Sequence, residues 1–364
     1  MFVFYNESIL SYLSSIRKYF KLSTDYPSDN QFDSFLKSNK FEQISLVLVD
    51  GMGSRLLKKQ LSDTAFLNAH LFKEVSTIFP SSTVPVTTAL LSGKTPNQTC
   101  WLGWMQYMEE VDSYVEMFRQ RDFYTKEAVD FEVKDHYPNY DMVDEMLKKG
   151  VKATRIMPSF DKEYGTADLD EFFDRLVEEN NSLKNRFVYG YIDEYDDLMH
   201  KEGPGSIEAK NLLRKINRRF EDASKKLSSK TLLMVIADHG QVDAQCLELE
   251  KTDLVEYFAK APALEPRAMT FFIKDGMHEQ FRKDFLKLLE DEFILLDKSQ
   301  VIETRVFGDH DDHPDFEKFI GDFLAIAKSD TFLTYKHVNS EYKGMHGGIT
   351  DEEMMVPVII YYQP

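Results

Sequence analysis

The sequence has few cysteines and no basic leader, and both absences bear on where the protein works. Two cysteines, Cys100 and Cys246, in 364 residues cannot form a disulfide framework, so we expect two free thiols in a reducing compartment. The first residues carry no basic stretch, and Asn6-Glu7 cut the initial apolar run short, which does not fit a signal peptide. These features predict a cytoplasmic protein.

Long apolar runs and an excess of positive charge are also missing. The longest apolar runs, Leu232–Ala237 and Val356–Tyr362, are far too short to cross a bilayer. With 62 acidic and 44 basic side chains, the formal net charge is −18. This excess argues against binding to a nucleic-acid polymer and against docking on an anionic membrane.

Several familiar catalytic motifs do not occur. There is no Gly-x-x-x-x-Gly-Lys-Ser/Thr loop for nucleotide phosphates and no Gly-x-Ser-x-Gly elbow of an α/β-hydrolase. A sulfatase requires a Cys/Ser-x-Pro-x-Arg context, which the stretch Pro80–Pro85 does not supply. Phosphate-loop, α/β-hydrolase and sulfatase chemistry therefore have no support.

Short apolar runs alternate with amphipathic helical stretches along most of the chain. Six runs have the length and β-branched content of buried parallel strands: Ile44–Val49, Val75–Phe79, Ala153–Met157, Arg186–Ile192, Leu232–Ala237 and Val356–Tyr361. Helical stretches between them include Glu7–Phe20, Asp168–Asn180 and Ser206–Leu227. The alternation predicts an α/β fold with a doubly wound, mostly parallel sheet flanked by helices.

Residues 261–328 break this alternation. They contain the strand-like Ala268–Ile273, the helix-like Glu279–Glu292, the strand-like Phe293–Leu296 and a polar loop at 308–314. We expect a small α+β lobe, inserted into a core formed by residues 1–260 and 329–364. Such a lobe is in a position to cap a site on the core.

Side chains that carry chemistry gather at the strand ends, where open α/β sheets bind ligands. Three aspartates and three histidines stand at such ends: Asp50, Asp196, His200, Asp238, His239 and His346. Each alone is more ordinary as a helix cap, a turn residue or a solvated pair. Together they offer the oxygen and nitrogen ligands that Zn²⁺ takes, and they indicate a metal site.

Five motifs occur in a fixed order. They are Asp50-Gly51; Phe79-Pro80-Ser81-Ser82-Thr83-Val84-Pro85 with Leu91-Ser92-Gly93 and Pro96; Asp196-x-x-x-His200-x-x-Gly203-Pro204; Asp238-His239-Gly240; and His346-Gly347. In this order they resemble the nucleotide pyrophosphatase/phosphodiesterase branch of the alkaline phosphatase superfamily. The resemblance runs from about Ile44 to Pro364 without the insert, and it implies an alkaline-phosphatase-like fold.

The resemblance also implies two divalent metal ions, usually Zn²⁺ with Mn²⁺ as the alternative, and a covalent nucleophile. One ion would be held by Asp196, His200 and His346, and the other by Asp50, Asp238 and His239 together with the nucleophile Thr83. A threonine hydroxyl is barely ionised at neutral pH and needs a metal to become nucleophilic. Without the resemblance, Thr83 reads equally as the cap of the helix that follows it.

One position departs from the family. Where nucleotide-processing relatives usually carry an Asn that donates to a phosphoryl oxygen, this chain has Trp104. We predict that Trp104 binds substrate, either through its indole N–H or in an aromatic wall with Trp101 and Tyr107. Core packing is an equal alternative for Trp101. The loop Asp309–His313 is expected to be a solvated turn rather than a metal site.

The sequence thus predicts a two-metal phosphodiesterase that acts on a small ester through a phosphothreonine. A phosphonate hydrolase or phosphomonoesterase with the same site stays open, as does a metal- or ligand-binding protein without turnover. The acidic net charge is compatible with an anionic substrate, because the ions would make their surroundings locally positive.

Overall fold

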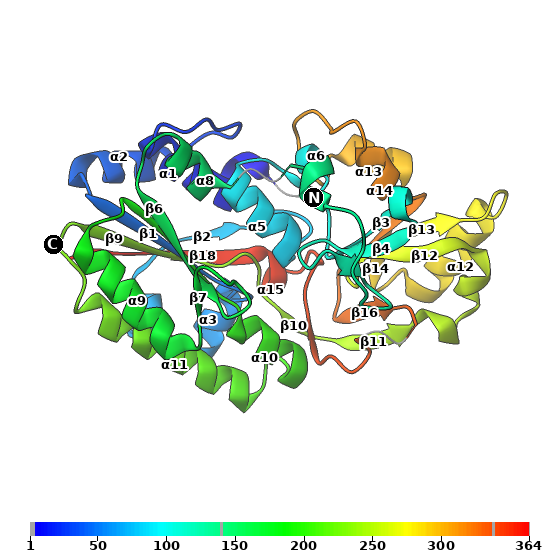
Figure 1. Cartoon of the computed structure of the whole chain (residues 1–364). Coiled ribbons are helices and arrows are strands. Elements are labelled where there is room, and N and C mark those ends of the chain that lie inside the picture. Colours follow the sequence, from blue (N-terminus) through cyan, green and yellow to red (C-terminus); the bar gives the residue numbers. More distant parts are fainter. Residues whose placement is uncertain (1–3, 139–140, 337–338, 364) are drawn as a thin grey trace.

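Two seven-stranded sheets lie side by side in the computed structural model, which describes residues 4–138, 141–336 and 339–363 (Figure 1). The first sheet has the order β2-β18-β9-β1-β8-β6-β7. Its strands are β2 (Leu71–Ser76), β18 (Met355–Tyr361), β9 (Thr231–Ile236), β1 (Gln43–Val49), β8 (Phe187–Ile192), β6 (Ala153–Pro158) and β7 (Gly165–Thr166). All seven residues of the central β1 are buried.

Most of the first sheet is parallel, which confirms the predicted fold class. β1 pairs in parallel with β8 and β9, and β6 pairs in parallel with β8 and β7. Only β18 runs against its neighbours β9 and β2. The parallel strand expected at Val356–Tyr361 is therefore antiparallel. The run Val75–Phe79 also differs, because β2 ends at Ser76 and is a half-buried edge strand.

The direction of β18 follows from where the chain enters it. The preceding segment lies at the edge where β1 and β9 end, since the Gly240 amide donates to the Glu353 carbonyl at 2.8 Å. A strand that starts at the carboxyl edge of parallel neighbours must run back along them. Apolar content and length alone do not carry that information.

Helices cover both faces of the first sheet (Figure 1). On one side lie α1 (Ile9–Tyr19), α2 (Asn30–Asn39), α5 (Thr83–Ser92) and α8 (Met142–Lys148); on the other lie α3 (Ser54–Gln60), α9 (Leu169–Ser182), α10 (Glu194–Glu202) and α11 (Ile207–Ser224). The amphipathic helices predicted from periodicity correspond to α1, α9 and α11. Short helices α4 (Phe66–Ala69), α6 (Pro96–Thr99), α7 (Val133–His136) and α15 (Asp351–Met354) occupy the connections.

The second sheet is antiparallel and has the order β14-β15-β13-β12-β3-β4-β5. Its strands come from two segments: β3 (Met105–Met108), β4 (Ser113–Glu116) and β5 (Arg121–Asp122), then β12 (Phe258–Glu265), β13 (Ala268–Ile273), β14 (Phe293–Asp297) and β15 (Phe323–Ala327). Helices α12 (His278–Leu289), α13 (Lys298–Thr304) and α14 (Phe316–Phe319) pack beside it. The division of the chain at residues 260 and 328 stays a prediction.

Two small ladders join the halves of the molecule. β10 (Val242–Asp243) pairs with β17 (Gly344–Met345), and β11 (Gln245–Glu248) pairs with β16 (Thr331–Thr334). One apolar cluster fills the first sheet and its helices, and two more pack around the second sheet. Within the described ranges, no helix has both the length and the apolar character needed to cross a bilayer.

Candidate active site

The first group of predicted residues meets where β1 and β9 end. Asp50 follows β1, Asp238 and His239 follow β9, and Thr83 is the first residue of α5. The Thr83 Oγ1 lies 3.2 Å from His239 Nε2 and 3.4 Å from Asp50 Oδ2. His239 Nε2 in turn lies 3.3 Å from Asp50 Oδ1 and 3.5 Å from Asp238 Oδ2. All four side chains are buried.

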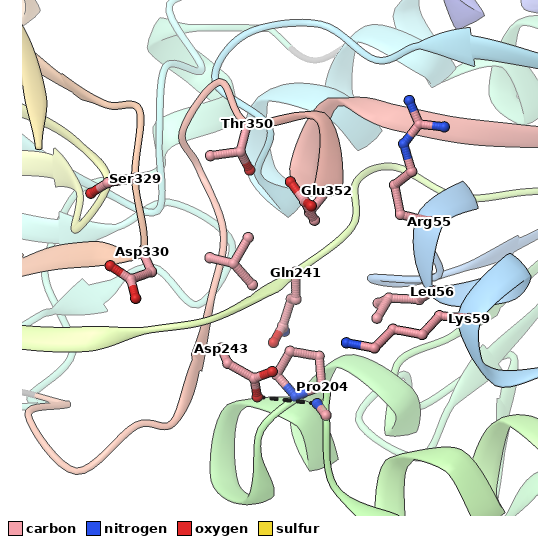
Figure 2. A pocket seen from close by; sticks show the side chains of 12 residues that line it. Arg55, Leu56, Lys59, Pro204, Gln241, Asp243, Ser329, Asp330, Thr350 and Glu352 are labelled. Atoms are coloured by element: carbon pink, nitrogen blue, oxygen red, sulfur yellow. Dashed lines mark hydrogen bonds between the residues drawn. The ribbon is translucent and has the colours of Figure 1, made fainter.

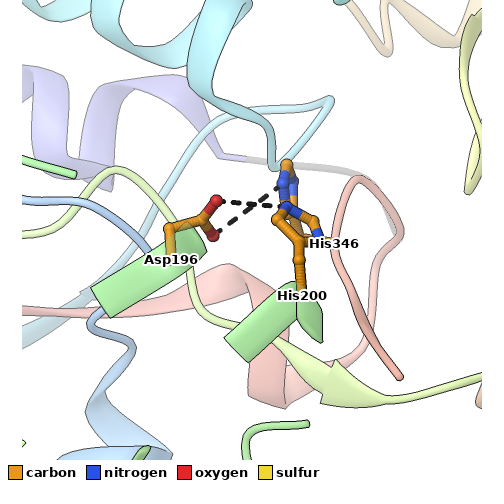
Figure 3. A group of neighbouring side chains, drawn as sticks. All are labelled: Asp196, His200 and His346. Carbon is orange, nitrogen blue, oxygen red and sulfur yellow. Dashed lines mark ion pairs between the residues drawn. The ribbon is translucent and has the colours of Figure 1, made fainter. Parts of the chain in front are cut away.

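The second group forms between α10 and the loop after β17 (Figure 3). Asp196 and His200 lie one turn apart on α10, with His200 Nε2 at 3.1 Å from Asp196 Oδ2. His346 brings its Nε2 to 4.0 Å from Asp196 Oδ1. The rings of His346 and His239 stack at 3.8 Å, so the two groups adjoin. Asp196 lies close enough to offer an oxygen to either group.

Each of the three imidazoles is oriented by a backbone carbonyl. The Nδ1 atoms of His200, His239 and His346 lie 2.8, 3.0 and 3.1 Å from the carbonyl oxygens of Gly344, Gly240 and Ser81. A carbonyl accepts only from a protonated Nδ1, which leaves the Nε2 lone pair directed at the carboxylates. This arrangement is typical of histidines that bind a metal.

One carboxylate oxygen of the site has no hydrogen-bond donor among the residues that the structure describes. Asp238 Oδ1 accepts from the amides of Gly51 and His239 at 3.2 and 3.0 Å, but its buried Oδ2 has no hydrogen-bond partner within the described part of the chain. Such an atom is costly to bury unless something compensates its charge. The donor set therefore fits a divalent cation, and the number of ions stays a prediction.

The charges in this buried volume shift each other's pKa. Burial and the nearby Asp238 and Asp196 raise the pKa of Asp50, and burial together with Asp196 raises that of Asp238. Burial would also raise the pKa of Asp196, but the imidazoles, led by His200, hold it well below its usual range. Burial and the neighbouring His239 lower the pKa of His346. The raised pKa values of Asp50 and Asp238 thus reflect carboxylates that lie close together in a buried site.

A glycine permits the close approach of β1 to α10. Gly51 turns the chain after Asp50 with a φ of +70°, and a Cβ there would lie 2.8 Å from Asp196 Oδ1. The left-handed conformation and the missing side chain are both needed at this turn. The Asp50-Gly51 pair thus lets the two ligand groups share one site.

The helix that begins at Thr83 presents an open N-terminus. Its N-cap residue Ser82 makes no side-chain cap bond within the described chain, and Pro85 in the first turn has no N–H. The amides of Thr83 and Val84 have no partner earlier in the helix, because the first turn never does. An uncapped helix start with a partial positive charge favours an anion beside the Thr83 hydroxyl.

The aromatic residues predicted to bind substrate separate into different environments. Trp104 is half-buried, and its ring lies 5.2 Å from the Arg119 guanidinium. Trp101 is wholly buried and donates from Nε1 to the Tyr137 carbonyl at 3.0 Å, so it packs in the core. Tyr107 donates its hydroxyl to Asp112 at 2.6 Å. The substrate role of Trp104 stays a prediction.

The polar loop Asp309–His313 supports its neighbours. Asp309 accepts from the Tyr26 hydroxyl and Asp312 accepts from Asn97 Nδ2, both at 2.7 Å. The metal-type clusters found in the described ranges do not include it. The loop therefore ties the second sheet to the segment that follows α5.

Three further residues contact the site and were not predicted. Tyr191 donates its hydroxyl to Asp50 Oδ2, and Gln241 donates from Nε2 to Asp196 Oδ1. Glu265 accepts from the Ser82 hydroxyl at 2.5 Å. Gln241 follows the Asp238-His239-Gly240 motif closely enough to have been suspected. Tyr191 and Glu265 carry no signal in the sequence.

A separate pocket of about 430 Å³ lies between α3 and the segments that carry Gln241 and Asp330 (Figure 2). Arg55 and Lys59 of α3 line it on one side and Asp330 on the other, with Gln241 between them. None of the predicted ligands lines this pocket. Among its lining residues, Gln241 contacts a predicted ligand, since it donates to Asp196.

Comparisons with known proteins agree with this geometry. Residues 45–349 match the family described as type I phosphodiesterase / nucleotide pyrophosphatase. Murine ectonucleotide pyrophosphatase / phosphodiesterase 5 superposes with a TM-score of 0.68 at 13% identity, covering 88% of each chain. Its inactive form in complex with AMP gives 0.67 at 13% identity, again over 88% of each chain.

A second kind of enzyme has a similar fold. Phosphonoacetate hydrolase from Sinorhizobium meliloti 1021, in complex with phosphonoformate, superposes with a TM-score of 0.64 at 16% identity, covering 88% of this chain and 90% of that one. At these sequence identities, the superpositions show that the fold is similar. No curated protein matches the sequence.

Proposed function

Because the chain belongs to the type I phosphodiesterase / nucleotide pyrophosphatase family and is thus a metal-dependent phosphoric ester hydrolase, we propose that it is a two-metal phosphodiesterase with Thr83 as nucleophile. The observation that carries this proposal is the place of the Thr83 hydroxyl, 3.2 Å from His239 Nε2 and 3.4 Å from Asp50 Oδ2 at an open helix start. The substrate is a small phosphate ester. A neighbour that binds AMP supports this substrate class.

We assign the six ligands to two cations. Asp196, His200 and His346 would hold one; Asp50, Asp238 and His239 would hold the other, with the Thr83 oxygen beside it. Mixed oxygen and nitrogen donors suit Zn²⁺, with Mn²⁺ as the alternative. When bound, the ions act as Lewis acids: they lower the pKa of a coordinated hydroxyl and neutralise charge on the attacking and leaving oxygens.

The chain's own groups set the course of the reaction. Thr83 Oγ1 forms a bond to phosphorus as the bond to the leaving oxygen breaks, which gives a phosphothreonine and the free alcohol. The amides of Thr83 and Val84 donate to the non-bridging oxygens. Water then attacks the same phosphorus, and Thr83 regains its proton as the phosphomonoester leaves.

Hydrolysis assays on the zinc-loaded protein test the proposal. We expect bound zinc in the purified protein and release of p-nitrophenol from bis(p-nitrophenyl) phosphate. A protein that binds neither Zn²⁺ nor Mn²⁺ and releases no product with either would contradict it.

The phosphonate hydrolase reading remains a second candidate. Its specific support is the similarity to phosphonoacetate hydrolase and the presence of Trp104 instead of the usual Asn. Parallel assays on bis(p-nitrophenyl) phosphate, p-nitrophenyl phosphate and phosphonoacetate separate diester, monoester and phosphonate chemistry. A ligand-binding protein without turnover would bind phosphate and hydrolyse none of the three.

Two broader predictions belong with this proposal. The free thiols Cys100 and Cys246 support a cytoplasmic location. We also propose that the lobe at residues 261–328 caps the catalytic core, supported by the contact of Glu265 with the residue before Thr83. Localisation of a tagged protein tests the first, and limited proteolysis at the two boundaries tests the second.

A further inference from the structure

The hairpin between β12 and β13 inserts a carboxylate beside the start of α5. Glu265 ends β12 and faces Ala268 across a two-residue turn. Only 4% of its surface is exposed. Its Oε1 accepts from the Ser82 hydroxyl at 2.5 Å and from the Trp104 amide at 2.6 Å. The carboxylate therefore lies between the candidate nucleophile's helix and the position that replaces the usual Asn.

Ser82 is a residue type that normally caps a helix. A serine at the N-cap accepts from the amide of the second or third helical residue. Here those residues are Val84 and Pro85, and proline has no N–H, so Val84 offers the single amide that Ser82 can accept. The Ser82 side chain makes no such bond, and its hydroxyl donates to Glu265 instead.

We propose that Glu265 is a positioning residue that holds the Ser82 hydroxyl away from α5 and keeps the Thr83 and Val84 amides free for phosphoryl oxygens. The proposal rests on the proposed function in one respect, namely that this helix start receives the phosphoryl group. It assigns a task in the reaction to the second sheet, which contributes none of the predicted metal ligands.

The turn of the hairpin is fixed, which restrains Glu265 from following Ser82 if that side chain rotates. Arg267, two residues further on, is fully buried. It donates to both oxygens of Glu353, at 2.6 and 2.8 Å, and to the carbonyls of Ser329 and Thr331 at 2.7 Å. Glu353 also accepts from the Gly348 amide at 2.8 Å, which anchors the hairpin to the loop that carries His346.

A purely structural role for Glu265 would lead to a different result when Glu265 and Ser82 are both replaced. If Glu265 only satisfies the Trp104 amide, its removal should damage the site whatever residue stands at position 82. If it restrains Ser82, a second change that removes the hydroxyl should undo the damage, because alanine cannot cap a helix. The double variant therefore distinguishes the two roles.

The first experiment measures binding of inorganic phosphate to the zinc-loaded protein by calorimetry, which needs no turnover. We expect E265A to bind phosphate about fivefold more weakly, the factor that corresponds to a helix cap of ordinary strength. E265A/S82A should return to within about twofold of the starting protein, as should E265Q, which keeps an acceptor oxygen. Unchanged binding in E265A, or no recovery in the double variant, would overturn the proposal.

Asp122 provides the matched control. Its carboxylate accepts from the Ser113 hydroxyl at 2.6 Å and from the Thr125 amide at 2.7 Å, elsewhere in the same sheet. D122A should leave phosphate binding unchanged. If D122A weakened phosphate binding as much as E265A does, the cause would be a general disruption of the second sheet. That result would contradict a specific role for Glu265.

A second measurement does not depend on whether E265A folds. Amide hydrogen exchange at Val84 in the metal-free protein should be equally fast in the starting protein and in S82A, since Ser82 does not cap α5. Slower exchange in the starting protein than in S82A would show a cap and overturn the proposal. Because neither readout involves turnover, an inactive protein with this pattern would refute the proposed function and leave the role of Glu265 standing.

Discussion

The carboxylates Asp50 and Asp238 determine how the site responds to pH. Burial and neighbouring carboxylates raise the pKa of both groups, so they keep their protons to a higher pH than an exposed aspartate does. A metal binds the ionised form and must displace those protons. We expect zinc affinity to fall as the pH falls through the range in which these carboxylates take up protons, by up to about tenfold per pH unit for each proton displaced.

Competition with a chromophoric chelator at several pH values measures this slope. D238N provides the comparison, since an amide releases no proton and the remaining slope should be shallower. An affinity that is flat or rises toward low pH would contradict the expected coupling.

Thr83 is the residue on which the chemistry depends. T83A should reduce turnover by at least about a thousandfold, because loss of a nucleophile removes a step that the rest of the site cannot replace. Zinc content and melting temperature should change little. T83S should keep part of the activity, since it retains a hydroxyl.

Thr87 is a fair control for Thr83. It lies one turn further along α5 and donates its hydroxyl to the Thr83 carbonyl at 2.6 Å. T87A should keep turnover within a few-fold. Equal losses in T83A and T87A would point to damage of the helix rather than to loss of a nucleophile.

The residues of the predicted metal site could be singled out because strand ends and short motifs mark them, and the structure brings them together. The residues that support the ligands could not. Tyr191 and Asp50 are 141 positions apart, and Ser82 and Glu265 are 183 apart, so their contacts exist only once the sheets have formed. Glu265 also ends a strand of the second sheet, far from any ligand motif.

At the scale of elements, the β12–β13 hairpin is held to the core by one buried ion pair. Arg267 and Glu353 are both fully buried, so removing either partner leaves an uncompensated charge. We expect R267M or E353Q to lower the free energy of unfolding by about 3–5 kcal/mol. Urea denaturation measures the loss.

The double variant R267M/E353L tests the reason for that loss. With both charges replaced by apolar groups, it should be more stable than either single variant. The pair Arg55–Asp351, whose side chains are 37% and 75% exposed, serves as the control. D351N, which breaks this pair and keeps the Arg55–Glu74 pair, should cost about 1 kcal/mol or less.

Helices and strands were predicted correctly where the local sequence pattern alone identifies the element. β13 has the predicted bounds, and β14 and α12 differ from theirs by a few residues. β3, β4 and β5 were not predicted, because strands of two to four residues give too short a pattern to recognise. Their place in the second sheet depends on pairing with β12, more than 140 positions away in the chain.

At the scale of the molecule, the predicted metal ligands come from segments spread over nearly 300 residues. Ions bound to Asp50, Asp196, Asp238 and His346 would join both central strands, α10 and the loop before β18. Zinc should therefore stabilise the folded chain by about 2.7 kcal/mol at a free concentration one hundred times its Kd.

Thermal unfolding with and without zinc, in chelator-treated protein, measures this effect. The rise in melting temperature should be clearly smaller in H346A, which lacks one ligand of the second group. H278A is the control, because His278 lies on α12 and belongs to neither ligand group. An equal rise in all three proteins would place the bound zinc elsewhere.

The position of β18 has a consequence for how the chain is made. This strand separates β2 from β9, so during synthesis the first sheet stays open until residues 355–361 leave the ribosome. Until then β9 presents an edge of unpaired backbone N–H and C=O groups, which is a template for pairing with another chain. Pairing of β18 with β9 and β2 removes that edge, so the strand both completes the first sheet and protects it against aggregation.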